Sequence, residues 1–316
     1  MTLSELDLSP AWVRVVAFVW GTLWGSFVNV VIYRIPRGMS VVHPPSHCPS
    51  CGAPIRAWQN VPVLGWIALR GRARCCGAPL SPRYLVVEVL GGAVGVAVAE
   101  LALFTSNPET SVIHVLCQSL ANFGLAMALL AVAFIDAEHM IVPDPITIGG
   151  TLLALATPGL RDLSWSESFA GALVGFVGIW LPFVFAYRHL RGRPGMGLGD
   201  AKLLMLAGAW FGWRGAAFAL FAGAAQATIA ALAMLTMHGR IEEPEAVRAD
   251  RQALEQAAAE GDAQAKELLE EDPLGSPPGE GFMAARMPFG PFLCLAMIEW
   301  MLAGEWIARR VQWLAV

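Results

Sequence analysis

Long apolar stretches are the feature that most limits what this chain can fold into. The sequence has 316 residues, of which 56% are hydrophobic and 15% charged, and its mean hydropathy is +0.56. A helix that crosses a bilayer needs about 20 apolar residues. We therefore predict an all-α, polytopic membrane protein with about eight transmembrane helices. The expected spans lie near residues 12–33, 84–104, 113–135, 146–160, 169–187, 200–213, 215–237 and 289–308.

The distribution of arginines predicts how these helices are oriented. Basic residues favour the cytoplasmic side of a membrane protein. Seven arginines lie in the loop 34–83 and three in the loop 188–199. If both loops are cytoplasmic, alternation of the helices places loops 136–145 and 238–288 on the same face. The two arginines at 309–310 fall on the opposite side and count against this orientation, but the ten outweigh them.

Aspartates occupy the ends of three spans on this face. Asp136 ends one span, Asp144 begins the next, and Asp200 begins another. Two carboxylates a few ångströms apart cannot both ionise easily, so they share a proton and titrate as a unit. One can take a proton from water while the other polarises a carbonyl group, which hydrolyses a peptide bond without a covalent intermediate. Asp136 and Asp144 compete as the partner of Asp200, and a helix start is the alternative role for Asp144.

Glycines precede the third aspartate, in the sequence GMGLGD. We expect Gly195, Gly197 and Gly199 to adopt positive φ angles and to let a substrate strand approach the backbone. The same spacing also fits a purely structural arrangement, in which Asp200 caps the helix that follows. Lys202 is expected to pair either with a carboxylate or with a lipid phosphate, and it supports the loop in both cases.

Four cysteines in the loop 34–83 predict a structural metal site. Cys48 and Cys51 form a C-x-x-C sequence followed by glycine, which is typical of a zinc knuckle. Cys75 and Cys76 are adjacent, and adjacent cysteines bind one metal only with a strained backbone. The candidate ligands of a tetrahedral Zn²⁺ site are Cys48, Cys51, Cys76 and either Cys75 or a histidine, His43 or His47.

The sequence CGAP occurs twice, at 51–54 and 76–79, which supports a module of two knuckles. Metal-free thiols and a redox pair are the alternatives to zinc. Disulfides are less favoured because the cytoplasm is reducing.

An acidic segment lies between the last two spans. Residues 239–280 contain twelve acidic and four basic residues, a net charge of −8. The stretch 242–272 is rich in helix-forming residues but has only a thin apolar face, so we expect one or two exposed helices. It is either a solvated spacer or a surface that attracts a basic partner.

These features divide the chain into five segments. They are an N-terminal transmembrane helix (1–33), a cytoplasmic Cys-rich loop (34–83), a transmembrane core (84–238), an acidic helical insertion (239–287) and a C-terminal transmembrane helix (288–316).

Five stretches of the chain together resemble the type IV prepilin peptidases, a family of aspartic membrane proteases. They are GSFVNVVIYRIPRG (25–38), SPRYLVVE (81–88), IDAEHMIVPD (135–144), GMGLGDAKLLMLAGAWFGW (195–213) and PFGPFL (288–293). The resemblance implies that Asp136 and Asp200 are catalytic. It also implies cleavage of the basic leader of type IV prepilins and pseudopilins at the cytoplasmic face of a bacterial inner membrane, followed by methylation of the new N-terminus from S-adenosyl-L-methionine.

The resemblance associates the Cys-rich loop with the methyltransferase activity. Glu88, at the start of the second span, either serves that activity or is a buried, paired carboxylate. The chain departs from the family pattern in two places. The first cysteine of the second C-x-x-C aligns with Ala73, so Cys75 either replaces it or the metal is absent, and the acidic insertion is longer than usual.

Two other functions fit parts of the sequence. A transporter would use Asp136 and Asp200 as an ion relay, with carboxylates near the membrane centre and inverted repeats. A membrane scaffold would dock partners through its metal loop and acidic insertion and would not need the aspartates. The partners that we expect are prepilins or pseudopilins and membrane lipid, with no nucleic acid.

Overall fold

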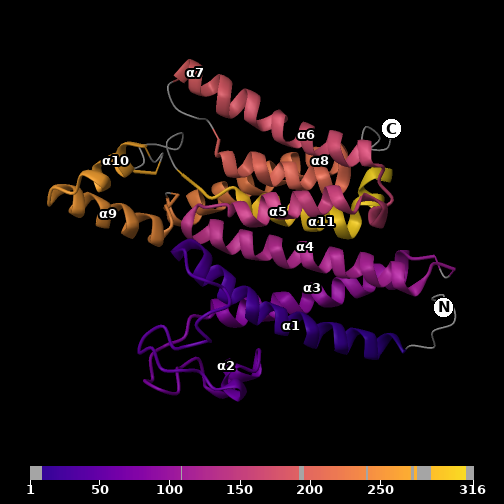
Figure 1. The fold of residues 1–316 in the computed structure, drawn as a ribbon, viewed down its shortest axis with the longest axis horizontal. Coiled ribbons are helices and arrows are strands. Elements are labelled where there is room, and N and C mark those ends of the chain that lie inside the picture. The colour runs from indigo at the N-terminus through magenta and orange to yellow at the C-terminus, as the bar shows by residue number, and fades with distance from the viewer. Residues whose placement is uncertain are drawn as a thin grey trace. The chain divides into compact units, whose positions relative to one another are not determined.

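The chain forms a bundle of long helices. The computed structural model describes residues 9–107, 109–191, 196–239, 241–271, 274–275 and 286–310. These residues contain no β-strand, and their only extended pairings are two isolated bridges. Six helices are long and apolar enough to cross a membrane, and α5 (Asp144–Ala156) is a shorter apolar helix (Figure 1). The all-α, multi-pass membrane fold predicted from the sequence is confirmed.

The other elements have the following bounds. They are α1 (Pro10–Arg34), η2 (Ile35–Arg37), η3 (Ala57–Asn60), α2 (Leu64–Ala68), α3 (Arg83–Thr105), α4 (Val112–His139), η4 (Pro158–Arg161), α6 (Trp165–Ile179), η5 (Trp180–Ala186), α7 (Tyr187–Arg191), α8 (Leu198–His238), α9 (Glu245–Ala259), α10 (Ala263–Glu271) and α11 (Gly290–Arg310).

The expected spans 200–213 and 215–237 correspond to the two halves of α8, which meet at a kink at Gly212. Gly212 has φ 72° and ψ 178°, a non-helical conformation that glycine adopts at little cost and that redirects the chain without a loop. With the two halves of α8 counted separately, the described residues hold an apolar helix at each of the eight expected spans.

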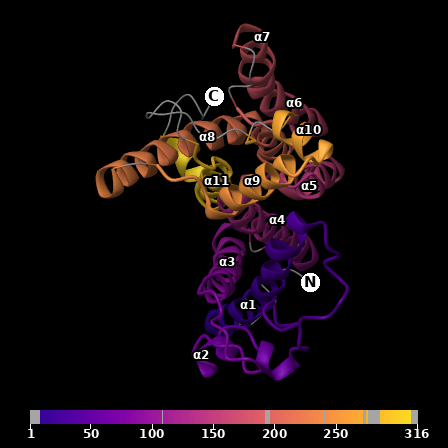
Figure 2. The same cartoon turned by 90° about the vertical axis from the view of Figure 1, so that its left-hand side faces the viewer.

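The chain divides into two compact units. The first runs from the N-terminus to Ala131 and includes 159–162 and 301–310. In it, α1 and α3 pack along one another, as both views show (Figures 1 and 2). A Cβ added at Gly21 would lie 2.2 Å from the carbonyl oxygen of Gly91, so only small residues allow this approach. The Cys-rich loop, with the short helix α2, connects these two helices.

The second unit comprises the described residues of 132–158 and 163–300. Its centre is the pair α6 and α8, whose backbones touch where Gly171 faces Gly208. The hydroxyl of Ser168 donates to the carbonyl oxygen of Ala209 at 2.6 Å and fixes the register of the two helices. The short helix α5 also packs on α8 and buries Thr147, as expected of a span that is too short to cross a bilayer alone.

The acidic insertion forms two helices, α9 and α10, which lie side by side in both views (Figures 1 and 2). This agrees with the expected one or two helices. Ahead of α9, the side chain of Glu243 is 3% exposed and pairs with Arg251 at 2.7 Å and with Arg286 at 3.7 Å. A buried carboxylate needs such partners, and these ion pairs tie the two ends of the insertion together. Residues 272–273 and 276–285 of the insertion lie outside the described residues.

Candidate functional site

Asp136 lies where the sequence placed it, in the last turn of α4. The residue is 5% exposed, and its Oδ2 accepts the backbone N–H of Gly290 at 2.9 Å. Gly290 is the first residue of α11, and a helix N-terminus favours a negative charge. A Cβ added at Gly290 would lie 2.8 Å from the same Oδ2, so this contact requires glycine.

Asp200 lies in the first turn of α8 and is half-buried. The turn of α8 that carries it packs against the segment that follows Asp136. The two segments that carry them meet at Val142, because a Cβ added at Gly199 would lie 2.8 Å from the Val142 Cβ. Carboxylates from helices far apart in the sequence therefore converge at one end of the second unit.

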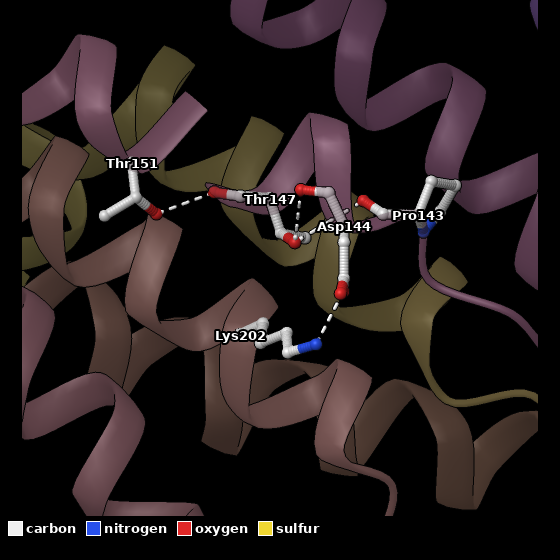
Figure 3. A network of polar contacts seen from close by, with 5 residues as sticks. All are labelled: Pro143, Asp144, Thr147, Thr151 and Lys202. Atoms are coloured by element: carbon white, nitrogen blue, oxygen red, sulfur yellow. Dashed lines mark hydrogen bonds and ion pairs between the residues drawn. The ribbon is translucent and has the colours of Figure 1, made fainter. Parts of the chain in front are cut away.

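Asp144, the other candidate partner, has a different neighbour. Figure 3 shows Lys202 reaching from α8 toward Asp144 at the start of α5, and its Nζ donates to Oδ1 at 2.6 Å. The Asp144 side chain is 54% exposed, in contrast to the buried Asp136. Thr147 donates to the carbonyl oxygens of Pro143 and Asp144, both at 3.4 Å, in the first turn of α5 (Figure 3). The structure thus pairs Asp144 with Lys202, and Asp136 with the amide of Gly290.

The glycines before Asp200 act through their size rather than through positive φ angles. Gly197 is the N-cap of α8, with φ −68° and ψ 143°, and Gly199 lies in the first helical turn. The predicted positive φ is therefore wrong for both residues, because α8 already begins at Leu198. Asp200 is not the N-cap itself, since Gly197 holds that position, but its carboxylate accepts the backbone N–H of Gly197 from the third position of the helix, as in one half of a capping box. Gly195 lies outside the described residues.

Gly290 is the residue of this site that reasoning from the sequence missed. A glycine followed by proline at the start of an apolar run indicates a helix start. It does not indicate that the amide of that glycine meets a carboxylate 154 positions earlier in the chain.

The four cysteines of the loop form one cluster. Their sulfur atoms all lie within 4.8 Å of one another. The Sγ atoms of Cys51 and Cys75 are 3.3 Å apart, and those of Cys48 and Cys76 are 3.8 Å apart. No histidine belongs to the cluster within the described part of the chain, and His47 instead contacts the carbonyl oxygen of Pro45 at 3.1 Å. Of the candidates that the sequence left open, Cys75 rather than a histidine lies beside the other three cysteines.

The backbone explains how adjacent cysteines fit. In the first knuckle, Cys48 N–H donates to Ala53 at 2.8 Å and Gly52 N–H donates to Cys48 at 2.9 Å. The second knuckle repeats this pattern 25 positions later, with Ala73 in the place of Cys48. Cys75 lies two positions further on and brings the fourth thiol into the cluster.

The thiols of the cluster differ in acidity. Burial raises the pKa of Cys48, but the backbone N–H groups of Cys51 and Ser50 outweigh it and lower that pKa to about 6. Hydrogen bonds to the sulfurs of Cys51 and Cys48 raise the pKa of Cys75 to about 12. A soft divalent metal bound by four thiolates would displace the protons that these sulfurs share.

Two family models and several named relatives match this chain. Residues 19–101 match the bacterial peptidase A24 N-terminal domain, and residues 123–232 match the type IV leader peptidase family. A prepilin leader peptidase/N-methyltransferase of Klebsiella pneumoniae is 34% identical over 228 residues, 67% of this chain and 93% of that protein. A protein of the same name from Myxococcus xanthus is 32% identical over 323 residues, 92% of this chain and 90% of that protein. The chain belongs to the type IV leader peptidase family.

The family matches follow the structure closely. The N-terminal domain match includes the Cys-rich loop and most of α1 and α3. The leader peptidase match begins within α4 and ends within α8, so both Asp136 and Asp200 lie inside it. A third relative of the same name, from Burkholderia pseudomallei, is 36% identical over 260 residues, 72% of this chain and 79% of that protein. No solved structure gives a significant match to the chain.

Proposed function

We propose that this protein is an aspartic membrane peptidase that cleaves the leader of type IV prepilins or pseudopilins and then methylates the new N-terminus. Membership of the type IV leader peptidase family and the shared name of the relatives support both activities. The observation that carries the peptidase assignment is the contact between Gly199 and Val142, which brings together the segments that carry Asp200, at the start of α8, and the buried Asp136, at the end of α4.

In this proposal, Asp136 and Asp200 share one proton and act as a unit. The ionised member takes a proton from the attacking water, and the protonated member polarises the carbonyl group of the scissile bond. The amide of Gly290 holds Oδ2 of Asp136 and so fixes the orientation of this carboxylate. The ion pair between Lys202 and Asp144 supports the site by joining the starts of α5 and α8.

The position of the pair suits a substrate that lies partly in the membrane. An apolar pilin helix stays in the lipid while its basic leader remains in water, so the scissile bond lies at the membrane surface. Both aspartates lie in terminal turns of membrane helices.

The ten arginines of the loops 34–83 and 188–199 support a cytoplasmic location for this end of the helices. The protein is thus proposed to lie in a bacterial inner membrane with its active site toward the cytoplasm. A transporter with an ion relay is the second candidate function. It needs carboxylates near the membrane centre, and the positions of Asp136 and Asp200 in the terminal turns of their helices disfavour it.

The direct test uses the purified full chain in detergent with a full-length prepilin. We expect mass spectrometry to show loss of the leader and, once S-adenosylmethionine is added, a gain of one methyl group on the new N-terminus. A prepilin that stays intact under conditions in which the protein is folded would refute the peptidase assignment.

We also propose that Cys48, Cys51, Cys75 and Cys76 hold a structural Zn²⁺ ion. Four thiolates are a common ligand set for structural zinc, and the sulfurs are already gathered within 4.8 Å. The loop is short of apolar residues, so a metal would contribute much of its stability.

Metal analysis tests this site. The native chain is expected to carry about one zinc ion, and Cys75→Ser is expected to lose most of it because one of the four ligands is gone. Cys117→Ser serves as the control, since Cys117 lies in α4 and is not part of the cluster. Equal zinc in Cys75→Ser and in the native chain would show that Cys75 is not a ligand, and a native chain without metal would remove the proposal.

A further inference from the structure

The first unit contains an open cavity of about 170 Å³ that the peptidase reaction does not use. It is lined by α1, α2, α3 and the Cys-rich loop, including Cys48 and Cys75. Its volume is far above the roughly 10–15 Å³ that hold one water molecule. The cavity therefore has room for a ligand, and its lining indicates which kind.

Two buried polar atoms in the wall of this cavity have no partner. Asn29 on α1 is 3% exposed, and its Nδ2 donates to the carbonyl oxygen of Tyr84 at 3.0 Å. Its Oδ1 and the Nε1 of Trp66 are both buried, and neither has a hydrogen bond within the described residues. Buried polar groups are nearly always hydrogen-bonded in native proteins. Two residues that line the cavity thus hold one unused acceptor and one unused donor.

The cavity also contains both signs of charge. Glu88 on α3 is 8% exposed, and its Oε2 accepts the N–H of Val63 at 2.7 Å. Val63 has φ 63°, which is rare for a β-branched residue and is maintained only where the surroundings enforce it. Arg34 on α1 is 4% exposed and donates to the carbonyl oxygens of Ser40 and Pro44, with no acidic partner in the described ranges.

We propose that this cavity binds S-adenosylmethionine, an inference that rests on the proposed methyltransferase activity. The molecule combines an aromatic base that donates and accepts hydrogen bonds, a carboxylate, and cationic ammonium and sulfonium groups. Trp66 offers a ring and the free Nε1 donor, and Asn29 offers the free Oδ1 acceptor. Arg34 matches the carboxylate, and Glu88 matches the cationic part.

The chemistry needs no further reagent. When the donor is bound, an amine nitrogen forms a bond to its methyl carbon, the carbon–sulfur bond breaks with its electron pair on sulfur, and the amine loses one proton. Glu88 acts here as a positioning residue, because its carboxylate is held by Val63 and attracts the cationic end of the ligand.

Direct binding to the full chain in detergent, measured by calorimetry, is the first test. Trp66→Phe keeps the ring and removes a donor that makes no hydrogen bond within the described residues. It is expected to weaken S-adenosylmethionine binding about 3- to 10-fold, with no loss of thermal stability. Trp58→Phe is the matched control, since Trp58 belongs to the same loop but is 51% exposed and does not line the cavity. Its Kd is expected to equal that of the native chain.

The second variant tests charge. Glu88→Gln keeps the side-chain volume and can still accept the Val63 amide, but it loses the negative charge. It is expected to weaken S-adenosylmethionine binding by about 10-fold or more. S-adenosylhomocysteine, which lacks the sulfonium charge, is expected to lose less. Leader cleavage, which depends on the second unit, is expected to remain in both variants.

The outcomes separate this inference from the proposed function. If the native chain binds the methyl donor and methylates pilin while both variants bind it with native affinity, the donor site lies elsewhere and the function stands. If the native chain methylates but shows no binding that these changes weaken, the inference fails in the same way. A native chain that neither cleaves nor methylates would overturn the proposed function itself.

Discussion

Replacing Asp136 or Asp200 by asparagine is expected to lower kcat/KM for leader cleavage by about 10³-fold or more. Asparagine matches aspartate in size, and its carbonyl oxygen can still accept the N–H of Gly290. It cannot take a proton from water, so the chemical step is lost while the site keeps its shape. Initial rates with a full-length prepilin in detergent provide the measurement.

Two controls make this prediction specific. Asp144→Asn removes a carboxylate that is 54% exposed and paired with Lys202, and an exposed ion pair contributes at most about 1 kcal/mol. Its activity is expected to fall by less than about 10-fold. Asp136→Asn and Asp200→Asn are expected to methylate a pilin that already lacks its leader, which shows that they are folded. An Asp144→Asn variant as inactive as Asp136→Asn would contradict the assignment of the pair.

Gly171→Ala is expected to destabilise the protein by about 3 kcal/mol or more. The added Cβ would lie 2.2 Å from the carbonyl oxygen of Gly208, where α6 and α8 touch. Backbone atoms on both helices would have to separate, which would also strain the hydrogen bond from Ser168 to Ala209. The measurement is the midpoint of thermal unfolding in detergent.

The matched control lies on the same helix. Gly178 belongs to α6, and a Cβ added there meets nothing within 4 Å. Gly178→Ala is therefore expected to leave stability unchanged or raise it by up to ~1 kcal/mol, since alanine favours a helix over glycine. Equal midpoints for the two variants would show that α6 and α8 are not in close contact.

The sequence predicted the membrane helices and the positions of the aspartates in their terminal turns for a simple reason. Apolar length specifies a span, and polar residues at the ends of spans on one face must share a membrane surface. The predicted boundary between the spans 200–213 and 215–237 lies close to Gly212, where non-helical backbone separates the two halves of α8. The positive φ that we expected at Gly197 and Gly199 occurs at Gly212 instead.

The spacing of glycines in the sequence indicates part of the helix packing. The sequences GTLWG (21–25), GGAVG (91–95) and GALVG (171–175) have glycines four apart, a pattern typical of tightly packed membrane helices. They lie on α1, α3 and α6, and each contributes to a close backbone contact. The position of the fourth thiol could not be predicted from the sequence. Spacing alone does not show that Cys75 joins the cluster when Ala73 occupies the place that Cys48 has in the first knuckle. That answer required the backbone hydrogen bonds of both knuckles.

The hydrogen bond from Gly290 to Asp136 gives α11 a second role, because it holds a carboxylate in position as well as spanning the membrane. A protein truncated after α8 would keep Asp136 and Asp200 but would lose the Gly290 N–H that is bonded to Asp136. The contact with Asp136 therefore depends on where α11 begins, while the ion pair between Glu243 and Arg286 holds together the two ends of the segment that separates α8 from α11.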